Sequence, residues 1–270
     1  MSKKIILLAG PTASGKSRLA IQLANKLNGE IINADSMQVY KEFAILSSRP
    51  ENKEVKKVKH HLYGIISVKR YFSAGDWLKL TKSEIKKCHE KKKTPIIVGG
   101  TGLYFNTITK GISKIPTIDI KTRNKVRSLF KKLGYKEFYK KLINIDPKVK
   151  NRILPTDSQR TQRAYEVILK TKKSLFDWTM NTKPDFINFE IKKIFIDIPR
   201  EELLKKISQR TELMFKNKCI EEVKKFNSFK LNKSLSANKL IGVQEINAYL
   251  QGSISLDECK ELINIKTRQY

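Results

Sequence analysis

The segment with the clearest chemical signature spans residues 10–17 of the chain. It matches the pattern G-x-x-x-x-G-K-[ST], in which backbone N–H groups and a lysine surround phosphate oxygens and a hydroxyl contacts Mg²⁺. In order, its residues are Gly10, Pro11, Thr12, Ala13, Ser14, Gly15, Lys16 and Ser17. An apolar run at 5–9 predicts a buried strand before it, and apolar spacing over 19–27 predicts a helix after it. Because loop and flanks agree, the sequence predicts a phosphate or diphosphate site rather than a chance Gly-rich turn.

Polar residues also follow two other apolar runs. Asp35 follows the run at 31–32, and Gly99, Gly100 and Thr101 follow the run at 96–98. Ligands of an open parallel sheet bind at the carboxyl ends of its strands. Asp35 could therefore act as a general base or hold Mg²⁺ through water, or it could cap a turn. No acidic residue directly ends the run at 96–98, which disfavours an ATPase and leaves room for a diphosphate that is not a nucleotide.

Arginine is scarce in this lysine-rich chain, so the placement of each arginine is informative. Arg160 and Arg163 lie three residues apart on a predicted helix and therefore share a face. Such a pair suits contacts with a phosphate backbone, and the alternative is an ordinary charged helix face. Arg210, on a later predicted helix, could reach a leaving phosphate as a lid arginine does. The pair His60 and His61 has no third metal ligand nearby in the sequence, so we expect structural or strand-edge histidines.

Composition favours a nucleic-acid partner in a reducing compartment. The 56 basic and 26 acidic residues give a formal net charge of +30, which suits a polyanion but could in part be compositional drift. The three cysteines (Cys88, Cys219 and Cys259) are far apart and predict neither a disulfide framework nor a zinc site. A strand begins almost at the N-terminus and no apolar run reaches membrane-spanning length. We therefore expect a cytoplasmic protein without a membrane segment.

The alternation of strands and helices predicts an α/β fold with a P-loop-containing parallel-sheet core and a mainly helical inserted domain. We expect the first part of the core at 1–114, the insertion at 115–188, and the second part of the core at 189–270. Further strands are predicted at 61–66 and 194–198, and helices at 74–89, 103–108 and 201–218.

Six segments resemble, in order and in spacing, the motifs of the tRNA dimethylallyltransferase family. Besides the loop at 10–17, they are Asp-Ser-Met-Gln-Val-Tyr at 35–40, Gly-Gly-Thr-Gly-Leu-Tyr at 99–104, Asp-Ser-Gln-Arg-Thr-Gln-Arg-Ala-Tyr-Glu-Val at 157–167, Ile-Gly-Val-Gln-Glu-Ile at 241–246 and Arg-Gln-Tyr at 268–270. Several motifs in register are far more specific than a phosphate loop alone.

The resemblance implies a Mg²⁺-dependent enzyme that transfers a dimethylallyl group from dimethylallyl diphosphate to N6 of the adenosine 3′ of the tRNA anticodon. Nothing in the sequence demands more than a monomer, so we expect one. The resemblance also implies that Asp35 is the general base, that Thr101 positions Asp35, and that Arg210 neutralises the departing diphosphate. It implies that the loop at 10–17 holds the diphosphate, with Ser17 on Mg²⁺. The tRNA anticodon stem-loop would be contacted by Asp35, Ser36, Met37, Gln38, Thr101, Arg123, Gln159, Arg160, Thr161, Gln162 and Arg163.

The chain also departs from the family pattern. Leu46, Ser47, Ser48, Arg49 and Pro50 stand where the family usually has Gly-Thr-Ala-Lys-Pro, and Lys59 stands where it usually has proline. We expect altered loop packing there, without loss of activity. Family members continue past position 270 through a basic, Trp-containing segment, and its absence would weaken tRNA binding or stability.

Two other functions fit part of the sequence. A P-loop small-molecule or nucleotide kinase would share the phosphate loop, the strand-end aspartate and a lid arginine. An RNA-binding protein that has lost catalysis would explain the charge but not the presence of Asp35, Lys16 and Thr101 together. Nucleotide consumption distinguishes the kinase, and prenyl incorporation distinguishes the non-catalytic protein.

Overall fold

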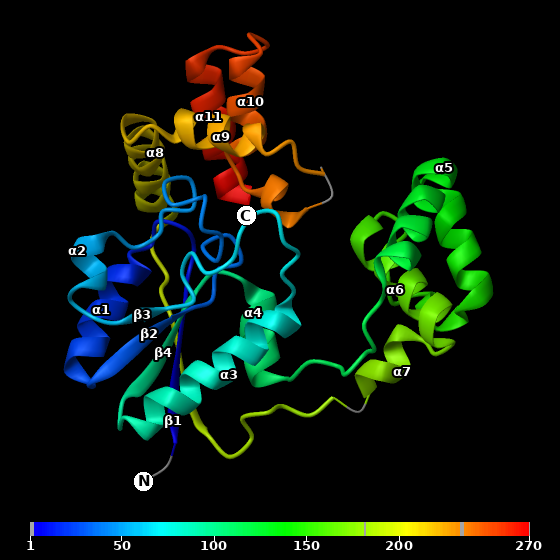
Figure 1. The fold of residues 1–270 in the computed structure, drawn as a ribbon, viewed down its shortest axis with the longest axis horizontal. Helices are drawn as coiled ribbons and strands as arrows, with labels where there is room; N and C mark the ends of the chain where they lie inside the picture. The colour runs from blue at the N-terminus through cyan, green and yellow to red at the C-terminus, as the bar shows by residue number, and fades with distance from the viewer. Residues whose placement is uncertain (1–2, 181, 233–234, 270) are drawn as a thin grey trace. The chain divides into compact units, whose positions relative to one another are not determined.

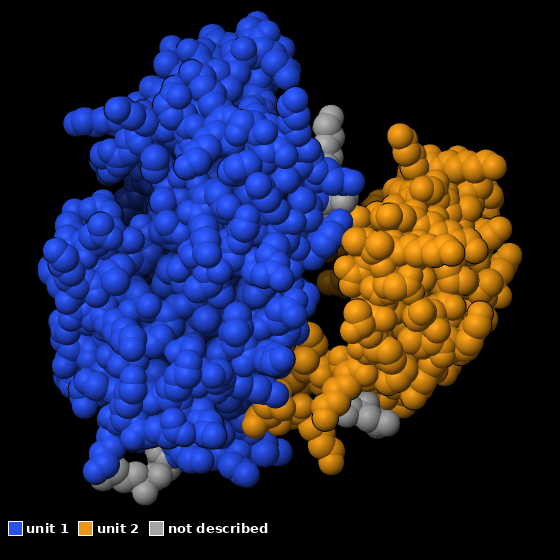
Figure 2. Space-filling view, in the orientation of Figure 1, with its two compact units in different colours: residues 1–108, 186–270 blue, residues 109–185 orange. Residues whose placement is uncertain are grey.

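A computed structural model describes residues 3–180, 182–232 and 235–269 of the chain (Figure 1). The chain divides into two compact units, which Figure 2 shows in different colours. Unit 1 comprises residues 1–108 and 186–270, and unit 2 comprises residues 109–185. Tyr270, the last residue of the motif at 268–270, lies outside the described residues.

The described part of unit 1 contains a five-stranded parallel sheet, in the order β3-β2-β4-β1-β5. Its central strands are mainly apolar and largely buried on both faces, which is the pattern expected of a parallel sheet covered by helices. This confirms the predicted α/β class. The strands are β1 (Lys4–Ala9), β2 (Gly29–Asn33), β3 (His60–His61), β4 (Thr94–Gly99) and β5 (Glu190–Phe195).

Helices cover both faces of the sheet, and each face has its own apolar core (Figure 1). Helix α1 (Lys16–Lys26) buries Ala20 and Ala24 against β1, β2 and β4. On the other face, α3 (Ala74–Glu90) and α4 (Gly102–Thr109) bury a stacked pair, Trp77 and Tyr104, whose ring centroids are 4.2 Å apart. The short helix α2 (Asn52–Val55) lies between β2 and β3 in the chain.

Two predicted strands have different bounds in the structure. The strand predicted at 61–66 is limited to His60–His61, because Leu62 and Gly64 both adopt positive φ and turn the chain. The strand predicted at 194–198 lies at Glu190–Phe195 instead. It pairs only with β1 at the edge of the sheet, where several of its side chains are exposed, so polar residues are tolerated there.

The C-terminal part of unit 1 is helical and packs on the segment that follows β2. It consists of α8 (Arg200–Lys216), α9 (Cys219–Ser228), the 3₁₀ turn Ser236–Lys239, α10 (Val243–Leu250) and α11 (Leu256–Gln269). Together with Tyr40, Phe43 and Leu46, these helices form a separate apolar core. Cys219 and Cys259 lie in that core as free thiols, and burial raises their pKa values to about 12 and about 11.

Unit 2 has a core of its own, built by helices alone in its described residues. The core is formed by α5 (Ile120–Ile145), the 3₁₀ turn Pro147–Val149, α6 (Ser158–Thr171) and α7 (Leu175–Met180). Gly134 interrupts α5 with a φ of 69°, a conformation that glycine adopts without steric cost. In the whole described chain, none of the helices combines the length and the apolar composition needed to cross a lipid bilayer.

Candidate active site

The phosphate loop leads directly into α1, and two of its residues, Ala13 and Gly15, adopt positive φ. Gly15 caps the helix with a φ of 86°, and the Lys16 Nζ donates to the carbonyls of Gly10 and Pro11 at 2.8 and 2.5 Å. Burial lowers the pKa of Lys16 to about 8; the charge of Asp35 opposes this shift and that of Arg210 adds to it.

Two hydroxyls complete the loop. The Ser14 Oγ is buried and has no hydrogen-bond partner among the described residues, whereas Ser17 is exposed at the start of α1. A buried hydroxyl without a partner beside a lysine and a helix N-terminus fits an anion. The Ser17 hydroxyl is accessible to a cation that accompanies that anion.

Asp35 caps the turn that follows β2. Its Oδ1 accepts from the backbone N–H of Met37 at 2.8 Å and, more weakly, from that of Gln38 at 3.4 Å. The side chain of Asn33 accepts from the Asp35 N–H at 2.8 Å. The turn cap considered from the sequence is therefore present. It does not exclude a chemical role, because these bonds use Oδ1 and the same residue lines a pocket.

Thr101 connects the end of β4 to the Asp35 turn. Its Oγ1 accepts from the backbone N–H of Ser36 at 2.9 Å, and its own N–H donates to the Ala34 carbonyl at 3.2 Å. The backbones of 34 and 99 approach so closely that a Cβ on Gly99 would lie 2.2 Å from the Ala34 carbonyl. Glycine is thus required at 99 for this contact between the ends of β2 and β4.

A pocket of about 90 Å³ brings together some of the predicted site residues of unit 1, whereas Lys16, Ser17 and Thr101 do not line it. Thr12 of the phosphate loop, Asp35 and Arg210 contribute its polar wall. Burial lowers the pKa of Arg210, and the charge of Asp35 opposes that shift. The other lining residues are mostly apolar and include Met37, Leu46, Met214, Leu240, Ile241 and Ile263. A carboxylate, a cation and an apolar wall beside a phosphate loop can bind an apolar phosphate ester and accept a proton.

Several polar residues around this pocket were not predicted, and Ser47 and Thr267 of its lining are among them. Lys239 lines it, the Ser48 Oγ accepts from the Arg210 Nε at 2.7 Å, and Glu222 of α9 binds the backbone of residues 44–46. The departure from the family pattern at 46–50 is the sequence feature that could have drawn attention to Ser48. Glu222 lies 176 residues from Leu46, and nothing in the sequence indicates that pairing.

The predicted tRNA contacts divide between the two units. Ser36, Met37 and Gln38 belong to the Asp35 turn, and the Gln38 side chain donates to the Ser47 and Ser48 carbonyls. Arg123, at the start of α5, and the residues of 159–163, at the start of α6, belong to unit 2.

Within unit 2 these residues differ in exposure. Thr161 is fully buried and donates to the Ser158 carbonyl, so it faces the core of the unit. The Nε of Arg123 is also buried, without a hydrogen-bond partner among the described residues. The side chain of Arg160 is 73% exposed and that of Arg163 38% exposed. These two arginines are therefore the accessible cations of the motif.

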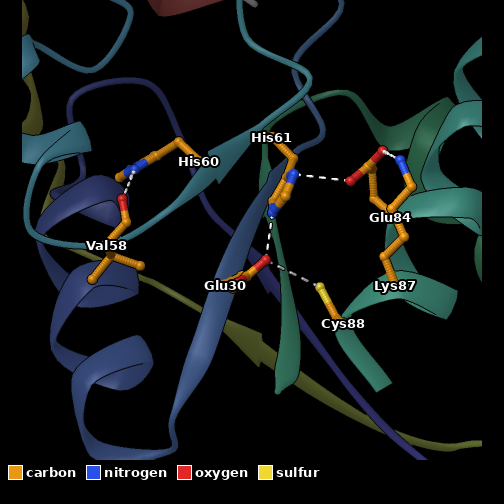
Figure 3. A network of polar contacts seen from close by, with 7 residues as sticks. All are labelled: Glu30, Val58, His60, His61, Glu84, Lys87 and Cys88. Carbon is orange, nitrogen blue, oxygen red and sulfur yellow. Dashed lines mark hydrogen bonds and ion pairs between the residues drawn. The ribbon is translucent and has the colours of Figure 1, made fainter. Parts of the chain in front are cut away.

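A buried polar network at the edge of the sheet accounts for the paired histidines (Figure 3). The two ring nitrogens of His61 contact Glu30 at 2.6 Å and Glu84 at 2.9 Å, and the Cys88 thiol donates to Glu30 at 3.8 Å. The ligand atoms of Glu30, His61 and Cys88 lie within 4.8 Å of one another, as those of a metal site would. With a carboxylate at each ring nitrogen of His61, this arrangement ties β2, β3 and α3 together through side-chain contacts. His60 contacts the Val58 carbonyl.

Comparisons with known proteins give one result throughout. A family model described as IPP transferase matches residues 38–270. The tRNA dimethylallyltransferase of Pelagibacter ubique is 53% identical over 267 residues, which cover 99% of this chain and 85% of that protein. That of Rickettsia massiliae is 41% identical over 269 residues, which cover 99% of this chain and 74% of that protein.

Solved structures similar to this chain agree with these sequence matches. A eukaryotic dimethylallyltransferase acting on tRNA is 28% identical with a TM-score of 0.81, covering 100% of this chain and 68% of that one. The full-length tRNA isopentenylpyrophosphate transferase from Bacillus halodurans is 29% identical with a TM-score of 0.68, covering 99% and 84%.

Proposed function

Because the chain belongs to the IPP transferase family, we propose that it transfers a dimethylallyl group from dimethylallyl diphosphate to N6 of the adenosine 3′ of a tRNA anticodon. The observation that carries this proposal is the pocket in which Asp35 and Arg210 meet the phosphate loop beside apolar side chains. The family match and the curated relatives confirm the resemblance to tRNA dimethylallyltransferases, and they do not favour the kinase alternative.

In the proposed reaction, the bond from the allylic carbon to the diphosphate oxygen breaks as the bond from N6 to that carbon forms. The N6 proton passes to the carboxylate of Asp35, and diphosphate leaves with its added negative charge. The exocyclic amine is a weak nucleophile, so a carboxylate that accepts its proton lowers the barrier. Thr101 supports this step indirectly, because its Oγ1 holds the Ser36 N–H next to Asp35.

Charge on the leaving group is the main electrostatic demand of the reaction. Lys16, the loop N–H groups and Arg210 would meet it from the phosphate side of the pocket. The apolar wall would hold the dimethylallyl group and exclude water from the allylic carbon.

The accessible hydroxyl of Ser17 and the partnerless hydroxyl of Ser14 fit a diphosphate accompanied by Mg²⁺. We propose that Ser17 helps to hold that ion, which would supply further positive charge to the leaving group.

The acceptor would be the anticodon stem-loop, whose target base must leave its stack at a cost of a few kcal/mol. Contacts from Arg160, Arg163 and other basic residues of this strongly basic chain to loop phosphates would offset that cost. A tRNA acceptor favours a cytoplasmic location, as do three cysteines that are all free. Nothing in the proposed chemistry requires more than one copy of the chain.

The test is incorporation of label from radioactive dimethylallyl diphosphate into unmodified tRNA with Mg²⁺, with an ATP-only reaction alongside. Asp35→Asn should lower incorporation by about 10²- to 10⁴-fold, because the amide cannot accept the N6 proton. Asparagine keeps an oxygen for the Met37 N–H, so the turn should survive.

The matched control is Asp76→Asn, which alters an exposed capping carboxylate of α3 and should leave incorporation unchanged. Wild-type incorporation by Asp35→Asn would refute the assignment of the base. ATP turnover without prenyl incorporation would reinstate the kinase.

A further inference from the structure

Residues 44–48 connect α9 to the pocket. Three consecutive backbone N–H groups, of Ala44, Ile45 and Leu46, donate to the carboxylate of Glu222 at 2.7, 2.9 and 2.8 Å. A carboxylate that accepts several N–H bonds at once is a strong and directional anchor. Phe43, just before the segment, packs on Phe226 of α9 with ring centroids 4.8 Å apart. The backbone of this segment is therefore fixed from α9.

The other end of this segment, at Ser47 and Ser48, contacts both Arg210 and the turn that Asp35 caps. The side-chain amide of Gln38, a member of the turn that Asp35 caps, donates to the Ser47 and Ser48 carbonyls at 2.8 and 3.1 Å. The Ser48 hydroxyl donates to the Ile45 carbonyl at 3.5 Å and accepts from the Arg210 Nε at 2.7 Å. One short segment thus contacts the turn of the proposed base and the arginine of the proposed leaving-group site.

Arg210 needs such an acceptor because a long side chain has many rotamers. Its Nε bond to Ser48 points the guanidinium in one direction, so less entropy is lost when diphosphate binds. The segment can orient Arg210 only if its own backbone is fixed, and Glu222 supplies that constraint.

We propose that Glu222 and Ser48 are positioning residues of this active site. Glu222 fixes the backbone of 44–46, and Ser48 at the end of the segment orients Arg210 toward the departing diphosphate. The inference rests on the proposed function for its catalytic readout. Neither residue touches the reacting atoms, and each acts through Arg210.

The first test compares Glu222→Gln with Glu221→Gln. Glutamine cannot accept all three N–H bonds, so the segment and Arg210 should shift, and a displacement of about 1 Å can cost about 100-fold in rate. We expect kcat to fall at least about ten-fold in Glu222→Gln, with little change in the Kd for tRNA. Glu221 is its exposed neighbour, is paired with Lys224, and should tolerate the change. A folded Glu222→Gln variant with the kcat of Glu221→Gln would overturn the role of Glu222.

The second test is a double-mutant cycle that does not depend on the stability of Glu222→Gln. Ser48→Ala should lower kcat about three- to ten-fold in the wild-type chain, in line with the loss of a hydrogen bond to a charged group. Lysine has no Nε–H, so Ser48→Ala should have no further effect in an Arg210→Lys background. An equal effect in both backgrounds would mean that Ser48 acts on general stability and would overturn the proposal.

A binding measurement separates failure of this inference from failure of the proposed function. Calorimetric titration with inorganic diphosphate and Mg²⁺ reports on Arg210 without any prenyl transfer. Glu222→Gln and Ser48→Ala should weaken diphosphate binding, and Glu221→Gln should not. If the wild type transfers no prenyl group but these binding differences remain, the proposed reaction is wrong and the positioning role stands. Unchanged diphosphate binding in both variants would refute the positioning role.

Discussion

Lys16 carries its charge at a place where burial disfavours it. Its pKa is lowered to about 8, so the ammonium of the free protein loses its proton as the pH rises through that value. A bound diphosphate would place negative charge beside the Lys16 Nζ and favour the protonated form of that amine. When diphosphate binds above pH 8, Lys16 should therefore take up as much as one proton from solution.

Calorimetry in two buffers of different ionisation enthalpy measures that uptake. We expect the wild type to take up more protons than Lys16→Met when inorganic diphosphate is added at about pH 8.5, and the difference to shrink toward pH 7. The comparison with Lys16→Met removes the protons that diphosphate itself exchanges. Equal uptake by the two proteins at pH 8.5 would mean that Lys16 is fully charged before the ligand arrives.

Single residues were predictable from the sequence where their environment is local. The phosphate loop could be read because eight consecutive residues and their two flanks determine it. The sequence placed Asp35 at a strand end, but only the structure shows that the residue both caps a turn and lines the pocket. Glu222 could not be predicted, since its three bonds depend on how α9 packs on a segment from the other end of the chain.

At the scale of elements, apolar runs located the buried strands and misplaced the edge strand. Runs of apolar residues identify β1, β2 and β4 because both faces of these strands are covered. The edge strand β5 begins Glu-Ile-Lys-Lys and keeps polar side chains in solvent, so its first half contains no apolar run. Its pairing with β1 was visible only in the structure.

The short edge strand β3 is held by side chains as well as by its ladder. Burial raises the pKa of Glu30, but the hydrogen bond and charge of His61 outweigh burial and hold that pKa below its ordinary value. Glu30→Gln should destabilise unit 1 by about 1–2 kcal/mol, because it replaces a charge-assisted bond to His61 with a neutral one. Urea unfolding followed by the fluorescence of Trp77 measures this in a Trp178→Phe background, since Trp178 belongs to unit 2.

The pH dependence of the stability difference between wild type and Glu30→Gln follows from the direction in which the pKa of Glu30 is shifted. A carboxylate with a lowered pKa stabilises the folded state above its ordinary value near 4.5, and the stabilisation is lost as the pH falls through the lowered value. The gap between wild type and Glu30→Gln should therefore close in acid. Glu90→Gln, which alters an exposed pair with Lys86, is the control and should cost less than about 0.5 kcal/mol. A gap that persists below the lowered pKa would show that Glu30 acts by packing rather than by charge.

At the scale of the whole molecule, the net charge of +30 has two explanations that make different predictions for tRNA binding. If basic residues contact phosphates, affinity should fall steeply with salt, because each contact releases counterions. If the charge is compositional drift, the slope should be shallow. Arg160 and Arg163 test these explanations directly, because both side chains are accessible and the pair of Arg160 with Asp157 is exposed, so phosphate can replace it at little cost.

We expect Arg160→Ala with Arg163→Ala to weaken tRNA binding at low salt and to reduce the slope of log K against log salt by about 2. The measurement is a filter-binding series from low to moderate salt, with unmodified tRNA and the intact chain. Lys86→Ala on α3 is the control, since its side chain is 80% exposed and lies outside the motif at 157–167. It removes the same charge as one arginine, so a loss of slope shared by Lys86→Ala would point to the general field of the protein. An unchanged slope in the double variant would make the arginine face of α6 an ordinary charged surface and move the tRNA contacts elsewhere on the chain.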